Sequence, residues 1–111
     1  QKDSAGISNV TPTQPQELTQ GYRVQVFATS SYDDAMSRKA TVEDQFADEW
    51  FYLVYDAPTY KLRAGNFHER YEADRFAKLL SEKGYRDAWV VPERVHKDPI
   101  PRTTQPPGLK K

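Results

Sequence analysis

The residue types best suited to chemistry in this sequence are two tryptophans and a few cationic and amide side chains within alternating segments. Arg23 and Gln25 alternate with valines, and Lys61 and Arg63 alternate with apolar residues in a second, similar segment. Flat aromatic rings can stack on the apolar faces of sugars, while guanidinium and amide groups bond hydroxyl, acetamido and carboxylate groups. These residue types indicate a binding surface.

Other chemistry-bearing residues form no pattern that indicates catalysis. His68 and His96 are isolated, there is no cysteine, and no His or Asp/Glu spacing resembles a metal site. Asp33-Asp34 and Asp48-Glu49 fall at predicted helix termini, where capping and solvation account for acidic residues. The sequence also lacks a Gly-rich phosphate loop and a nucleophile elbow. We therefore expect no enzyme, no cofactor and no metal.

Length and composition indicate one domain between polar tails. The chain has 111 residues, 16 basic against 16 acidic, and only 37% hydrophobic residues. Balanced charge argues against capture of nucleic acid, and we expect a monomer. Residues 1–20 are predicted to be a flexible linker, 21–95 the domain and 96–111 a disordered Pro-rich tail. No apolar run is long enough for a membrane helix, so membrane attachment would require an N-terminal anchor absent from this fragment.

Between these tails the hydrophobic pattern predicts four strands and two helices. We expect strands over residues 22–28, 50–55, 60–65 and 85–91, with the last strand ended by Pro92. The first helix should begin after an N-cap at Ser31 and end near Asp48. Ala73, Phe76 and Leu80 define the apolar stripe of the second helix, which Gly84 should stop.

The two halves of this pattern read as copies of one unit. Tyr22-Arg23-Val24-Gln25-Val26 aligns with Tyr60-Lys61-Leu62-Arg63-Ala64, and both helices follow at the same offset. Neither half can cover its apolar surface alone, so the halves should pack together. The expected fold is α+β, a βαββαβ ferredoxin-like sandwich. Its four-stranded antiparallel sheet (order 4-1-3-2) should carry both helices on one face.

The opposite sheet face, named the open face below, is the predicted binding surface. Strict alternation sends Arg23, Gln25 and Phe27 outward from the first strand. The same rule exposes Lys61 and Arg63 on the third strand. If Tyr55 pairs with Tyr60, then Trp50, Tyr52 and Val54 join them, and Trp89 is exposed on the last strand. Each residue alone also fits a surface or core-edge role; their convergence on one face favours binding.

The stretch from Tyr22 to Val95 resembles a SPOR (sporulation-related repeat) domain. The resemblance rests on the Tyr22 to Val26 strand, on the second repeat with its Gly65-Asn66-Phe67 ending, and on Trp89-Val90-Val91-Pro92. It implies a non-catalytic module of the bacterial cell envelope, in the periplasm. The implied ligand is the glycan strand of peptidoglycan stripped of stem peptides at the division septum, so that the module targets its parent protein there.

The resemblance also implies particular binding residues on the open face. Arg23 and Gln25 match the family's first strand, Ser30 the strand–helix junction, and Arg63 the second repeat. Free lactyl carboxylates of stripped glycan would give the arginines a partner. Phe27 stands where the first repeat usually has glycine, and on the open face it would add a stacking platform or narrow the groove.

Two other functions fit an aromatic open sheet face. RRM-type modules bind single-stranded RNA on such a face, although neutral charge and a missing Gly-Phe-x-Phe type signature argue against that reading here. A protein-docking module is the other alternative.

Overall fold

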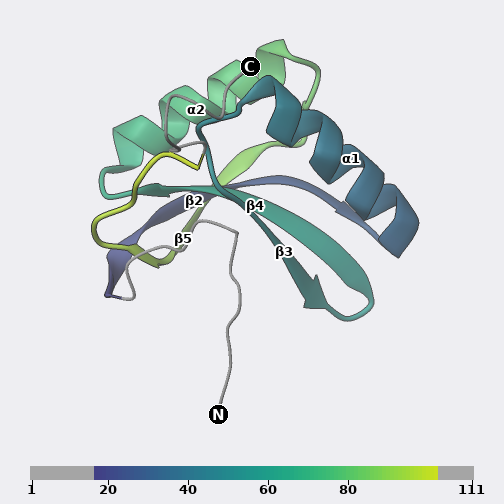
Figure 1. Ribbon diagram of the computed structural model, residues 1–111, viewed down its shortest axis with the longest axis horizontal. Helices are drawn as coiled ribbons and strands as arrows, with labels where there is room; N and C mark the ends of the chain where they lie inside the picture. Colours follow the sequence, from purple (N-terminus) through teal and green to yellow (C-terminus); the bar gives the residue numbers. More distant parts are fainter. Residues whose placement is uncertain (1–16, 103–111) are drawn as a thin grey trace, which may run out of the picture.

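A computed structural model describes residues 17–102, which form a two-layer α+β domain. The elements, in chain order, are β2 Leu18–Thr29, α1 Tyr32–Gln45, β3 Phe51–Asp56, β4 Thr59–Phe67, α2 Arg70–Glu82 and β5 Trp89–His96. Both helices cover one face of an antiparallel sheet with strand order β3-β4-β2-β5 (Figure 1). The predicted fold class and strand order are confirmed. Most of the predicted linker and tail lies outside the described residues.

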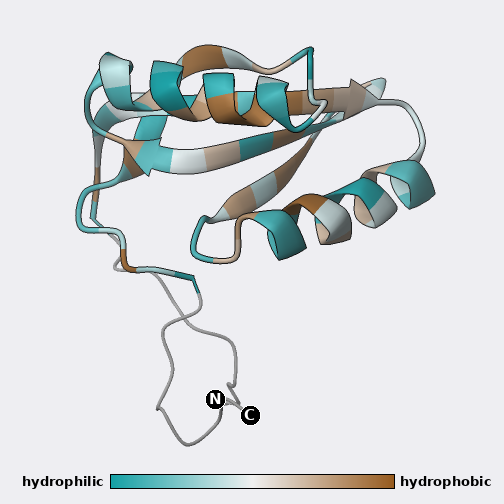
Figure 2. Ribbon diagram, turned by 90° about the horizontal axis from the view of Figure 1, so that it is seen from above, coloured by the Kyte–Doolittle hydropathy of each residue, from teal (hydrophilic) through white to brown (hydrophobic). Residues whose placement is uncertain are grey.

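The core lies between the sheet and the two helices. Figure 2 shows hydrophobic bands alternating with hydrophilic ones along the strands and helices, as expected for elements with one buried side. The largest fully buried side chains of this core are Leu62, Leu80, Val24, Val26 and Val42. Phe46 and Phe67 both pack against Phe76 of α2, with ring centroids 5.1 and 5.7 Å away.

Local capping signals define the helix ends. Ser31 Oγ accepts a hydrogen bond from the Asp34 backbone N–H at 3.1 Å, as predicted for the N-cap of α1. Helix α2 begins with a capping box between Glu69 and Glu72, and Gly84 follows its end with a φ of 103°. Helix α1 ends at Gln45, three residues before the predicted end.

The first strand departs from strict alternation, which corrects the prediction for Phe27. A register shift between Gln25 and Phe27 in the β2–β4 pairing inserts an extra residue, so Val26 and Phe27 both belong to the hydrophobic core. Phe27 is only 3% exposed, and the Arg38 guanidinium of α1 lies 4.1 Å from its ring centroid. Phe27 therefore faces the helices, and the next residue, Ala28, is exposed.

The last strand also differs from its prediction. β5 begins at Trp89, continues through Pro92 and ends at His96, because an edge strand tolerates a residue without an N–H donor. Its added residues pair with the start of β2, where Leu18 lies opposite His96. Strand β2 begins three residues before the predicted limit of 21, and β5 ends one residue after the predicted limit of 95.

Residues 97–102 are hydrogen-bonded to the C-terminal end of α1 and to the two residues before β3. The Trp50 indole N–H donates to the Ile100 carbonyl at 2.6 Å. Arg102 donates from Nε to the Glu49 carbonyl (2.6 Å) and from Nη2 to the Glu43 carbonyl (2.7 Å). Helix α1 has no basic residue in its last turn, so Arg102 supplies the positive charge that a helix C-terminus favours.

Candidate functional site

The open face is built by alternating residues of all four strands. Tyr52 pairs with Arg63, Arg63 with Gln25, and Gln25 with Trp89, so these four side chains form a row across the sheet. The facing of β3 is confirmed, because Tyr55 pairs with Tyr60 and Phe51 with Ala64. Sequence alternation therefore placed this row correctly.

Arg23 lies at the centre of the open face, but the residues that contact its guanidinium bury it. Its Nε donates to the Gly65 carbonyl at 3.0 Å, and its Nη2 donates to Asn66 Oδ1 at 2.9 Å. Its guanidinium also lies 4.1 Å from the centroid of the Tyr52 ring. The residue is 8% exposed. Arg23 faces as predicted, and its guanidinium is held within the face by Gly65, Asn66 and Tyr52.

A bulge in β4 brings these acceptors to Arg23. The register shifts between Tyr22 and Val24 of β2, so two β4 residues, Gly65 and Asn66, lie opposite Arg23. Gly65 has a φ of 86°, and an added Cβ would overlap the Phe67 ring, so only glycine fits here. Asn66 Oδ1 also accepts from the His96 N–H at 2.9 Å.

Glu93 and Asn66 are site residues that the sequence analysis missed. Glu93 accepts from Arg23 Nη1 at 3.3 Å and from Arg63 Nη1 at 3.4 Å. Asn66 Nδ2 donates to the Tyr52 hydroxyl at 2.8 Å. The predicted strand ends at Pro92 and therefore leaves out Glu93, whereas β5 continues to His96. An alternating pattern continued through Pro92 to Val95 would have placed Glu93 beside the arginines.

The cationic side chains predicted for the open face are largely neutralised by carboxylates. Arg23 and Arg63 share Glu93, and Lys61 Nζ lies 2.8 Å from Asp56 Oδ2. Three cations against two carboxylates leave one net positive charge on this part of the face. The hydrogen bond from Lys61 and its positive charge lower the pKa of Asp56, which is otherwise solvated.

Replacing Lys61 with methionine should return the pKa of Asp56 toward its ordinary value. Because the folded-state pKa is lowered, the pair forms above the ordinary Asp pKa and is lost as pH falls through the folded-state pKa. Carboxyl-carbon NMR titration of Asp56 measures the change, and Lys78→Met on exposed α2 is the control. The same Asp56 pKa in the Lys61→Met protein would show that the ion pair does not form.

The remaining predicted site residues lie around this row. Trp89 is 56% exposed beside Gln25 at the outer edge of the open face. Trp50 is partly covered and directs its N–H to Ile100, so it anchors residues 97–102. Ser30 is exposed one residue after the end of β2, before the N-cap. Phe27 lies outside the site, on the opposite sheet face.

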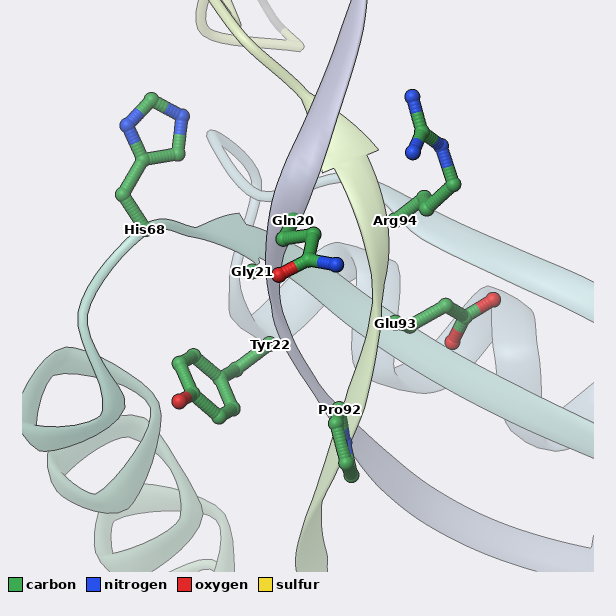
Figure 3. Close-up of a pocket in the computed structure, with 7 residues that line it drawn as sticks. All are labelled: Gln20, Gly21, Tyr22, His68, Pro92, Glu93 and Arg94. Atoms are coloured by element: carbon green, nitrogen blue, oxygen red, sulfur yellow. The ribbon is translucent and has the colours of Figure 1, made fainter.

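A hollow of about 530 Å³ is lined by residues of the paired strands β2 and β5 and by His68 (Figure 3). Tyr22 points toward α2 in this view, whereas Glu93 points away on the other side of the strand pair. The hollow shares only Glu93 with the arginine network. Within residues 17–102, no cluster of three or more potential metal ligands occurs, and no helix could span a membrane.

Comparison with known proteins identifies the family. The SPOR domain family matches residues 18–92, a span from the start of β2 to the middle of β5. This chain therefore belongs to the SPOR domain family, as its sequence motifs indicated. SPOR domains are binding domains known for peptidoglycan binding, and they occur in cell-envelope proteins. No curated protein matches the chain, and no solved structure matches it.

Proposed function

We propose that this domain binds the glycan strands of peptidoglycan through the open face. The observation that carries the proposal is the row Trp89–Gln25–Arg63–Tyr52 on a sheet face without helices. An exposed indole provides a flat apolar platform for a sugar ring, and the adjacent amide and guanidinium provide hydrogen bonds to its substituents. The domain supplies binding and no catalysis.

The preferred ligand in this proposal is glycan without stem peptides. A flat sheet face can approach sugar rings closely only when bulky substituents such as stem peptides do not intervene. Glycan stripped of stem peptides is found where daughter cells separate. The domain would thus direct its parent protein to the division septum, in the periplasm, as a monomer.

Co-sedimentation with purified sacculi tests this proposal. We expect the protein to pellet with intact sacculi and to pellet more completely after an amidase has removed the stem peptides. Equal amounts in the supernatant with and without sacculi would refute glycan binding. Salt-sensitive binding of single-stranded RNA, with no binding of sacculi, would instead favour the RRM-like alternative.

A further inference from the structure

Glu93 holds a carboxylate between the two arginines of the open face. One carboxylate oxygen, Oε2, accepts from Arg23, and the other, Oε1, accepts from Arg63. The Glu93 side chain is 26% exposed, and those of Arg23 and Arg63 are 10% and 21% exposed. Each arginine at the centre of the face is therefore already paired with an anion belonging to the protein.

An acidic ligand group could not take over this pairing without meeting Glu93. Arg23 is held by Gly65, Asn66 and Tyr52, so its guanidinium cannot turn outward. Arg63 is more accessible, but its Nε donates to Gln25 Oε1 at 3.2 Å and its Nη1 to Glu93. A ligand carboxylate that approached Arg63 would lie next to the Glu93 carboxylate.

We infer that Glu93 determines the charge selectivity of the open face, favouring uncharged sugar substituents at its centre and disfavouring the lactyl carboxylate there. This inference rests on the proposed glycan binding. Like charges brought together at a partly desolvated surface repel, because water and ions screen them incompletely. A hydroxyl or acetamido group meets no such repulsion and can bond to the Gln25 amide or to free N–H groups of Arg63.

The arginines could either bind a ligand carboxylate or support a site for uncharged groups, and the two roles predict different ligand preferences. With Glu93 in place, a site that reads carboxylates would bind an acidic ligand more tightly than its neutral analogue, whereas the inferred site would not. Here, Glu93→Gln keeps an oxygen that accepts from an arginine while removing the negative charge. The amide oxygen can accept from only one of the two arginines, so the substitution loosens the contact with the other arginine and frees positive charge for an acidic ligand.

Short glycan fragments of matched length, carrying either free lactyl carboxylates or their methylamides, test this inference. We expect the unmodified protein to bind the methylamide at least as tightly as the acid in calorimetric titrations. Glu93→Gln should bind the acid roughly fivefold to tenfold more tightly than the unmodified protein does, and the methylamide within about twofold. Added salt should weaken the new binding of the acid and leave that of the methylamide nearly unchanged.

Glu82→Gln is the matched control, because Glu82 is an exposed residue of α2 on the helix side and its substitution changes net charge equally. It should leave both affinities unchanged. The inference is overturned if the unmodified protein prefers the acid, or if Glu93→Gln shifts both ligands alike or neither. If Glu93→Gln does not fold, the preference of the unmodified protein decides. Failure of the unmodified protein to bind either fragment or sacculi refutes the proposed function itself.

Discussion

Replacing Arg23 with alanine should lower the free energy of unfolding by about 2–4 kcal/mol, because the change removes several hydrogen bonds from buried and partly buried polar groups. The Gly65 carbonyl and Asn66 Oδ1 each lose a hydrogen bond, and Glu93 loses one of its two arginines. Tyr52 loses the cation over its ring. For a domain of this size the expected fall in Tm is about 10–25 °C, measurable by calorimetry or circular dichroism.

Arg70→Ala provides the matched control for this experiment. Arg70 lies at the first turn of α2, and its pair with Asp74 is long, at 3.7 Å, with both side chains more than half exposed. Its removal should change stability by less than about 0.5 kcal/mol. Arg23→Lys should recover only part of the loss, because an ammonium group cannot reproduce the planar fork of donors. An Arg23→Ala protein as stable as Arg70→Ala would contradict the structural role assigned to Arg23.

Replacing Trp89 with alanine should have the opposite profile: a large loss of binding and little loss of stability. Trp89 is 56% exposed, so truncation removes little buried surface and should change stability by less than about 1 kcal/mol. If its ring is the sugar platform, affinity for stripped sacculi should fall roughly tenfold to thirtyfold, as for an aromatic hot spot. Quantitative sedimentation across a range of sacculus concentrations measures the change.

Tyr71→Ala tests whether loss of any exposed aromatic ring would do the same. Tyr71 is 60% exposed on α2, on the helix side of the sheet. Its truncation should leave sacculus binding unchanged, and Trp89→Tyr should retain part of the affinity because a flat ring remains. Equal binding by Trp89→Ala and Tyr71→Ala would place the ligand away from the Trp89 edge of the open face.

The two predictions separate residues that face the same way but act differently. Arg23 and Trp89 are both on the open face, and sequence alternation cannot distinguish them. Their exposed fractions are 8% and 56%, so we expect the first to organise the face and propose that the second contacts the ligand. The difference arises because Arg23 lies on a central strand opposite the β4 bulge, whereas Trp89 lies on the edge strand.

The sequence by itself determined local features: the alternation within strands, the apolar spacing of the helices and the helix N-cap. Alternation in β3 and β4 predicted that Tyr52 lies beside Arg63, and the hairpin pairing of Tyr55 with Tyr60 set the register. Helical spacing identified Ala73, Phe76 and Leu80 as core residues, and Ser31 was recognised as an N-cap. Such features depend on neighbours within a few residues along the chain, so their signals can be seen without the fold.

What only the tertiary structure decided depends on contacts between distant segments. The bulge that turns Phe27 into the core is a property of how β2 pairs with β4, and single-strand alternation cannot show it. Glu93 reaches Arg23 from 70 residues away, because β5 continues past Pro92 as an edge strand. Apart from Phe27, the alternation rule predicted which side chains face outward, and the pairing of distant strands decided how far each of them is exposed.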